Sequence, residues 1–386
     1  MASSSYATPC NQLRPQGSAD LSAPVAESSS TGATPSSPRT ESIVPNPLTV
    51  PNDPSSSHQP TSNRKPRKPR IPLTGTPEEI LAKNRTAAPQ FWVDKTVRLA
   101  GKHWNDFYRN HQAVPFFKER HWTEREWDLK HKLGQGDPQG KGKGKAVLET
   151  GCGTGAFIYP LLELYPEAKF VGFDFAAKAV ELTKAHANHD PSRVHIFQHD
   201  LTEPPTAPSL AARLADVPPE FGEPVFKFDI VSHVFVLSAL APRNHAAAVK
   251  TLVGLLKPGG SLLIRDYALH DEAQLRFHAL PSASYATVPA LLSNQTDTNP
   301  TSDSPSATAD SSSELEQNRP WYKRGDQTMT YFFSSQEVQG LVDQACRELG
   351  VTVEGSIEVV ERKLENRAQE WECTRRFVHG SWTRVE

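Results

Sequence analysis

Three short stretches of this sequence carry residues that could bind a polar organic ligand, and each follows an apolar run. The first, Glu149-Thr-Gly-Cys-Gly-Thr-Gly155, places three glycines between an apolar run and a helical pattern. Glycines allow a tight turn that a ligand can approach closely, and the N–H groups of the following helix point toward that ligand. The next two apolar runs lead to Asp174 and to Asp200-Leu201. A carboxylate about 20 residues beyond such a turn can hold both hydroxyls of a ribose, so the pattern indicates a nucleoside-containing ligand.

The spacing of the glycines separates this turn from other nucleotide-binding motifs. Gly151, Gly153 and Gly155 form G-x-G-x-G, which is neither the dinucleotide fingerprint G-x-G-x-x-G nor a Walker phosphate loop. The turn resembles motif I of the class I methyltransferases, which use S-adenosylmethionine (SAM). Asp174 and Asp200 follow in the order in which such enzymes hold ribose and adenine. The alternative is that both carboxylates are ordinary loop residues.

Longer stretches of sequence narrow the family. Two of them, Trp104-Asn-Asp-Phe-Tyr108 and Phe116-Phe-Lys-Glu-Arg-His-Trp122, precede the glycine-rich turn. The chain closely resembles the eukaryotic tRNA 3-methylcytidine methyltransferases over roughly residues 91–280 and 318–384. The other stretches that carry this resemblance are Phe235-Val-Leu-Ser-Ala239, Leu256-Lys-Pro-Gly-Gly260, Arg265-Asp-Tyr267, Asp271 with Gln274-Leu-Arg-Phe277, Tyr322-Lys-Arg-Gly-Asp326 and Tyr331-Phe-Phe333.

The resemblance implies a set of cofactor contacts. Trp104 and Tyr108 would close over the SAM site, and their aromatic faces suit a sulfonium cation. Asp174 would bind the ribose, and carboxylates accept hydrogen bonds from hydroxyl groups. The resemblance places Gly151 and Gly153 along the methionine moiety and Asp200 and Leu201 at the adenine. It places Val234 near the sulfonium. From the residues alone, Trp104 and Tyr108 could instead be a packed helix stripe, and Val234 a core residue.

The implied reaction is formation of 3-methylcytidine at position 32 in the anticodon loop of a subset of tRNAs. The ring nitrogen N3 has a lone pair, so alignment supplies most of the acceleration. Because the ring gains positive charge, a nearby carboxylate would stabilise the transition state, and Asp266 is the candidate catalytic residue. Asp266 could equally pair with Arg265 or Arg276. Phe235 could stack on a base turned out of the loop, or belong to the core.

Gripping tRNA requires positive charge, although the formal net charge is -2. The candidate tRNA contacts are Lys118, Arg120, His121, Arg265, Arg276, Arg324 and Arg362. If scattered, they are ordinary solvated charges. The family also suggests a protein partner, such as an aminoacyl-tRNA synthetase or another accessory protein. One departure from the family is that Ala241-Pro242 replaces its usual His-Pro, so we assign no proton role there.

The periodicity of the sequence predicts the elements that must position these residues. Apolar runs at 146–149, 169–174, 194–198, 228–237 and 261–265 predict strands, helical patterns at 157–164, 176–187 and 244–256 lie between them, and runs at 351–364 and 370–384 predict a hairpin. Apolar strands alternating with helices indicate a parallel sheet covered on both faces. With the resemblance, we expect an α/β fold with a seven-stranded, mostly parallel sheet, helices on both faces, and an antiparallel C-terminal hairpin, Rossmann-like as in class I methyltransferases.

Composition divides the 386 residues into three parts. Between Tyr6 and Phe91 there is no aromatic residue, so residues 1–85 are expected to be a disordered Ser/Pro-rich tail with a basic cluster at 64–70. Residues 86–145 would be an aromatic and basic helical extension that covers SAM and contacts tRNA. Residues 146–386 would be the methyltransferase domain, with a low-complexity insert at about 282–317.

Other protein classes are disfavoured. The sequence has no apolar run of about 18 residues and no secretory signal, so no membrane partner is expected. Its four cysteines lack any C-x-x-C spacing, which argues against a metal site. We expect a cytoplasmic protein, with the nucleus as an alternative because of the basic cluster; acidic residues near the N-terminus argue against mitochondria. Two alternatives stay open: a methyltransferase of a protein or small molecule, and a non-catalytic RNA-binding accessory subunit.

Overall fold

The computed structural model describes residues 73–82, 88–111, 118–134, 136–202, 209–279, 320–366 and 371–385. All of these lie within one compact unit, Lys68–Glu386. The basic cluster at 64–70, the insert at 282–317 and most of the tail predicted for residues 1–85 lie outside the described residues.

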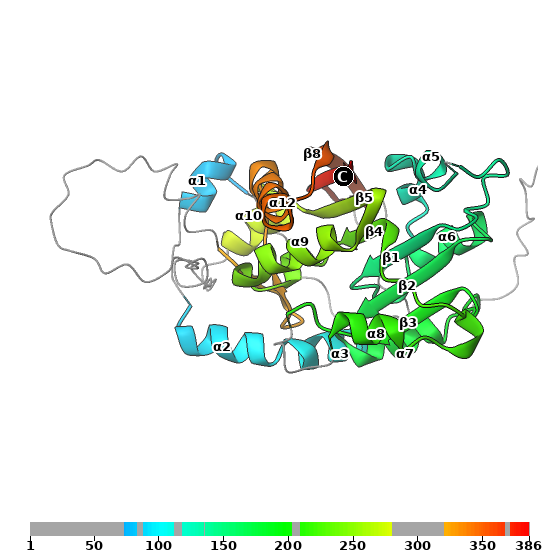
Figure 1. Cartoon of the computed structure of the whole chain (residues 1–386). Coiled ribbons are helices and arrows are strands. Elements are labelled where there is room, and N and C mark those ends of the chain that lie inside the picture. Colours follow the sequence, from blue (N-terminus) through cyan, green and yellow to red (C-terminus); the bar gives the residue numbers. More distant parts are fainter. Residues whose placement is uncertain are drawn as a thin grey trace, which may run out of the picture. The chain divides into compact units, whose positions relative to one another are not determined.

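The centre of the fold is a seven-stranded sheet in the order β3-β2-β1-β4-β5-β9-β8 (Figure 1). Its parallel strands are β1 (Ala146–Thr150), β2 (Lys169–Asp174), β3 (Val194–Gln198), β4 (Phe228–Val234) and β5 (Leu256–Tyr267). β9 (Trp371–Arg384) lies antiparallel to β5, and β8 (Val353–Asn366) lies antiparallel to β9. The predicted mostly parallel sheet with a C-terminal hairpin is confirmed. Ligands of such sheets bind at the carboxyl ends of the strands, where the strand order reverses, here between β1 and β4.

Helices cover both faces because successive strand residues point to opposite sides. Val147 of β1 packs with α4 (Trp122–Glu126), α5 (Leu129–Gly134) and α6 (Ile158–Leu164). Its neighbour Leu148 packs in the opposite core cluster with α8 (Leu210–Ala215), α9 (His245–Gly254) and α12 (Ser335–Leu349). Buried aliphatic side chains such as these contribute roughly 1.5–3 kcal/mol each. The two clusters hold the sheet as a rigid layer, so its strand ends are fixed points.

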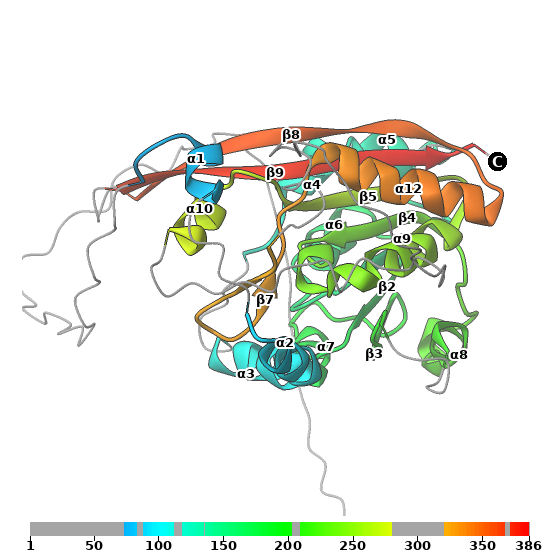
Figure 2. The same ribbon diagram turned by 90° about the vertical axis from the view of Figure 1, so that its left-hand side faces the viewer.

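The remaining elements lie around the sheet and its two core clusters. α2 (Gln90–Arg98) is followed by α3 (Ala100–Asn110), which packs on α7 (Ala177–Lys184). A separate two-stranded piece, β6 (Tyr322–Lys323) with β7 (Met329–Thr330), was not predicted. The long hairpin β8/β9 runs along one edge of the sheet, and α10 (Glu272–His278) lies near its distal half (Figure 2).

Several predicted boundaries were wrong. The strand predicted for 228–237 ends at Val234, because Phe235 has a φ of 61° and turns the chain. β5 begins at Leu256 rather than at the predicted residue 261, because Leu256 pairs with Phe228 before a bulge, so the helix predicted for 244–256 ends earlier, at Gly254. The region also contains the short 3₁₀ helices η1 (Pro219–Phe221), η2 (Leu237–Ala239) and η3 (Pro242–Asn244).

The prediction of a disordered tail up to residue 85 was wrong at its end, where α1 spans Pro77–Ala82. Thr76 and Glu79 form a capping box: the Glu79 amide donates to Thr76 Oγ1 (3.2 Å) and the Thr76 amide to Glu79 Oε2 (3.0 Å). Ile80 and Leu81 are buried against Leu275 of α10. Counting aromatic residues missed this helix because its buried side chains are aliphatic.

Within the described ranges, no helix is both long and apolar enough to cross a membrane.

Candidate active site

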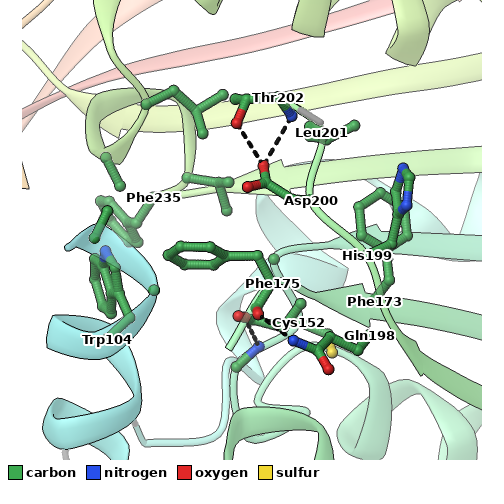
Figure 3. A pocket seen from close by; sticks show the side chains of 18 of the residues that line it. Trp104, Cys152, Phe173, Phe175, Gln198, His199, Asp200, Leu201, Thr202 and Phe235 are labelled. Carbon is green, nitrogen blue, oxygen red and sulfur yellow. Dashed lines mark hydrogen bonds between the residues drawn. The ribbon is translucent and has the colours of Figure 1, made fainter. Parts of the chain in front are cut away.

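A cavity of about 430 Å³ opens at the carboxyl ends of β1, β2, β3 and β4 (Figure 3). The structure brings together in its wall all the residues that the resemblance assigned to the cofactor: Trp104, Tyr108, Gly151, Gly153, Asp174, Asp200, Leu201 and Val234. They come from α3, the glycine turn after β1, the ends of β2 and β4, and the segment after β3. Residues separated by up to 130 positions therefore surround one ligand-sized space.

The glycine turn presents its backbone to the cavity. Gly151 and Gly153 have φ values of 61° and 56°, in the left-handed region that favours glycine. A Cβ on Gly151 would overlap the side chain of Val236, and one on Gly153 would lie 2.9 Å from the hydroxyl of Tyr108. The Cys152 amide donates to the carbonyl of Phe173 (3.0 Å), which fixes the turn to β2. Only glycine fits these two positions, so the backbone can lie directly against a ligand.

Asp174 joins the turn to the end of β2. Its Oδ2 accepts from the Gly153 amide (3.0 Å) and its Oδ1 from the Ala176 amide (2.9 Å). Burial raises the pKa of Asp174 to about 6, although these two backbone N–H groups oppose the rise. Each carboxylate oxygen has a second lone pair, so the group can also accept both hydroxyls of a ribose. A nucleoside with a free ribose therefore fits the side chains that are present.

α3 covers the cavity with aromatic side chains. Trp104 and Tyr108 lie with ring centroids 6.0 Å apart, and Phe107 packs beside both. Asn105 Oδ1 accepts from the amide of Lys178 at the start of α7 (2.8 Å), which anchors the helix. Burial raises the pKa of the Tyr108 hydroxyl well above its usual value, so it stays a neutral donor. The cover therefore presents neutral aromatic faces, which can attract a cationic ligand such as a sulfonium.

Phe175 is a cavity residue that sequence reasoning missed. It follows Asp174 directly, and its ring extends into the middle of the cavity toward Trp104 (Figure 3). An aromatic ring here offers a face for stacking on an adenine. The only signal in the sequence is its place directly after Asp174, and a phenylalanine after an apolar strand is otherwise interpreted as a core residue.

Arg120 also lies in the cavity wall, 9% exposed, rather than on an outer surface. Its Nη1 lies 3.3 Å from Oε1 of the buried Glu149, and its amide donates to the carbonyl of Ala156 (2.7 Å). Burial raises the pKa of Glu149 to about 8, and the positive charge of Arg120 opposes that rise. The ion pair ties the segment after α3 to the glycine turn, so the prediction that Arg120 grips the tRNA surface does not match its position.

A second, mostly aromatic wall adjoins the cavity. The Phe235 ring lies 5.0 Å from Tyr267 and 5.5 Å from Phe377 between centroids, and its amide donates to the carbonyl of Arg265 (2.7 Å). The guanidinium of Arg324 lies 5.3 Å from the Tyr267 ring. Non-glycine residues with positive φ are rare and concentrate at functional sites, which agrees with a role for Phe235 beyond core packing. We call Phe235, Tyr267 and Phe377 the aromatic wall.

Asp266 lies behind this wall and does not line the cavity. It is fully buried; its Oδ2 accepts from the Ser238 amide (2.9 Å) and its Oδ1 from the Tyr267 amide (2.8 Å). Burial raises its pKa to about 6, against these hydrogen bonds. The alternative of a pair with Arg265 or Arg276 is wrong, because these bind Glu126 and Glu272. Direct contact of Asp266 with a substrate is not supported either; it orders the backbone that carries the wall.

The remaining predicted tRNA contacts fall into two groups. Arg265 is 4% exposed, packed between the rings of Trp122 and Phe377 and paired with Glu126, so a phosphate contact by Arg265 is not supported. The others are at least partly exposed: Lys118, His121 beside Glu119, Arg276 beside Glu272, Arg324 beside Thr330, and Arg362 beside Glu126.

Strand order, a glycine turn after β1 and a buried carboxylate at the end of β2 that accepts from that turn together define a class I SAM-dependent methyltransferase. Residues 148–262 match the protein family described as "Methyltransferase domain". The chain is also similar to a SAM-dependent methyltransferase structure from Anabaena variabilis, at 10% identity and a TM-score of 0.43 over 78% of this chain and 97% of that one.

Two curated relatives specify the family further. The chain is 28% identical over 295 residues to the tRNA N(3)-methylcytidine methyltransferase trm141 of Schizosaccharomyces pombe, covering 76% of this chain and 96% of that protein. It is 37% identical over 207 residues to the tRNA N(3)-cytidine methyltransferase METTL6 of Pongo abelii, covering 54% and 67%. The chain belongs to the tRNA N(3)-cytidine methyltransferase family, as its sequence motifs predicted.

Proposed function

We propose that this protein transfers a methyl group from SAM to N3 of cytidine 32 in the anticodon loop of a subset of tRNAs. Family membership supports the reaction, the methyl donor and the tRNA substrate. The observation that carries the assignment of this site is the adjacency of two walls: the cavity with its glycine turn and Asp174, and the aromatic wall at Phe235. The first fits a nucleoside cofactor and the second fits an unstacked base.

When bound, SAM supplies an electrophilic methyl group at its sulfonium. The chain's own part is to hold and align. The glycine turn and Asp174 fix the nucleoside end, and Trp104 and Tyr108 exclude water above it. Phe235 and Tyr267 offer faces on which a base turned out of its loop can stack. Because cytosine N3 carries a lone pair, alignment of the two walls replaces any need for a general base.

We assign Asp266 a positioning role. Its carboxylate accepts from the amides of Ser238, three residues after Phe235, and of Tyr267, whose ring packs on Phe235. Asp266→Asn keeps the size of the side chain but loses one acceptor, so it should lower kcat for tRNA and leave the Kd for SAM within about twofold. A loss of SAM affinity as large as the loss of kcat would contradict this role.

The test of the function is incubation of the protein with SAM and unmodified tRNA transcripts, followed by primer extension through the anticodon loop. A methylation-dependent stop at position 32 is the expected result, and Asp174→Ala should remove it. Methyl transfer to protein or free nucleoside, with none to any tRNA, would overturn the proposal in favour of the first alternative. SAM binding without any transfer, also in cell extract, would favour an accessory RNA-binding subunit.

We further propose that some tRNAs require a partner, such as an aminoacyl-tRNA synthetase, and that the protein acts in the cytoplasm. The family suggests the partner, and the basic cluster at 64–70 makes the nucleus the alternative location. Activity on a transcript that appears only when extract is added supports the partner. Imaging of a fluorescent fusion with and without residues 64–70 tests the location.

A further inference from the structure

The two most exposed phenylalanine or tryptophan side chains among the described residues are neighbours at the start of α2. Phe91 is 65% exposed and Trp92 is 51% exposed, and their ring centroids lie 5.6 Å apart in an edge-to-face arrangement. The opposite face of α2 is docked on the protein through Val93 and Thr96, which are 5% and 7% exposed. Packing of this face holds α2 in place, and the helix presents two aromatic rings to solvent. A ligand that stacks on these rings would therefore not have to order the helix backbone.

Positive charge continues from this pair along the helices. Lys95 Nζ lies 5.0 Å from the Trp92 ring, and Arg98 lies three residues further on the same side of α2. Lys102 follows in the first turn of α3. We call these three the cationic row. Asp94 and Asp106 lie beside it, the first bonded to Gln90 and the second to Lys102 and Arg109, so the row keeps a net positive charge.

The row leads to the active site. Arg98 lines the cavity together with Gly101 and Trp104, and it lies seven residues, or about 10 Å of helix, from Phe91. The segment at β6 also lies at the cavity, because Trp321 lines it. Lys323 of β6 lies near α3, since the pKa of His103 is lowered first by burial and then by the positive charges of Lys323 and Lys102. Cations from α3 and from β6 therefore lie near His103, the residue before Trp104 of the cavity wall.

This combination selects one kind of occupant. Aromatic side chains beside a positively charged track bind single-stranded nucleic acid, because every base has a face for stacking and every nucleotide has a phosphate. We propose that Phe91 and Trp92 form a stacking platform for an unpaired base of the tRNA loop, near the nucleotide that enters the active site. The inference rests on the proposed function and adds a contact outside the cavity.

The test compares wild-type protein with the double variant Phe91→Ala/Trp92→Ala. We expect its Kd for tRNA to rise at least about fivefold, the lower end of what one base stacked on an aromatic side chain contributes. The Kd for SAM should not change. Phe226→Ala is the matched control: Phe226 is 45% exposed but precedes β4, at the opposite end of the strands, and should leave both constants unchanged. Trp92→Phe should retain most of the affinity.

Salt dependence separates stacking from charge. The aromatic double variant should lower affinity without changing the slope of log Kd against log salt concentration, since no phosphate contact is lost. Lys95→Ala should reduce that slope by about one. If the double variant binds purified tRNA as tightly as wild type, the inference is wrong; if it then loses only the stimulation by cell extract, the platform serves a protein partner. Wild-type protein that methylates no tRNA would instead overturn the proposed function, and this inference with it.

Discussion

Asp174 is the residue on which cofactor affinity should depend most directly, because its carboxylate both accepts from the glycine turn and lines the cavity where we propose that the ribose binds. Asp174→Asn removes the charge at constant size. Hydrogen bonds to a charged group contribute about 1.5–3 kcal/mol each, so we expect the Kd for SAM to rise about tenfold or more. Isothermal titration calorimetry measures it.

Asp229 is a matched control for Asp174, because it is a carboxylate at the amino end of β4, at the opposite end of the strands from the cavity. Asp229 of β4 also accepts a backbone amide, from Ala146 (2.9 Å), and pairs with Lys257 (2.6 Å). Asp229→Asn should lower Tm and leave SAM affinity unchanged. An equal loss of SAM affinity in both variants would mean that Asp174 acts through general stability rather than through the ribose.

Cofactor affinity should also depend on pH. The pKa of Asp174 is raised to about 6, so the group is largely protonated at pH 5 and ionised at pH 7. Ribose hydroxyls donate to the ionised form, so affinity should rise with pH through this window and then level off. SAM should bind about tenfold more weakly at pH 5 than above pH 7. In Asp174→Asn the dependence should vanish; if it persists, another group titrates.

The roles of residues could be predicted from the sequence where the residue type itself determines the chemistry. Glycines at 151 and 153 and a carboxylate at 174 have few other reasons to follow apolar runs, and the structure places them together. Phe175 was not predictable, because a phenylalanine looks the same in a core and in a cavity. Asp266 was misread because its partners are two backbone amides, which no spacing in the sequence reveals.

At the scale of elements, the turn between β1 and α6 makes the sharpest prediction. Gly151→Ala would force an L-residue into a left-handed conformation and push its Cβ into Val236, so SAM affinity should fall at least about tenfold. Gly259→Ala is the matched control, since Gly259 has a φ of 77° with nothing within 4 Å of a Cβ. It should cost only about 1–2 kcal/mol of stability. Adding Val236→Ala to Gly151→Ala should restore part of the affinity; no recovery would mean that backbone strain alone is responsible.

The bounds of strands with a clear apolar run were predicted to the residue. The bounds of elements that depend on pairing with a distant segment were not. β2 and β3 end where their apolar runs end. β5 extends back through a Pro-Gly-Gly segment because Leu256 finds a partner in Phe228, and β6 exists only because β7 pairs with it. α1 is held by its capping box and by α10, which is about 200 residues away. Such contacts join segments distant in the chain, so local patterns carry no signal of them.

At the scale of the whole molecule, two N-terminal truncations that differ by the presence of α1 should differ in stability. Removing residues 1–72 should leave both Tm and the Kd for SAM unchanged. Removing residues 1–82 also takes away Ile80 and Leu81 and exposes Leu275 of α10, so Tm should fall while SAM binding persists. Differential scanning fluorimetry and calorimetry measure the two quantities. A tenfold weaker Kd for SAM after the shorter truncation would show that the removed segment supports the cavity.

β9 enters the sheet between β5 and β8, although it is the last strand in the chain. It brings Phe377 to the ring of Phe235 and places the Arg375 guanidinium 5.3 Å from Tyr267. The cavity residues, in contrast, come almost entirely from positions 97–244. During synthesis on the ribosome, the methyl-donor half of the site can therefore assemble first. The aromatic wall is complete only when the C-terminal strand has emerged. A nascent or truncated chain would therefore have the cavity for the methyl donor but an incomplete binding surface for the cytosine base of the tRNA.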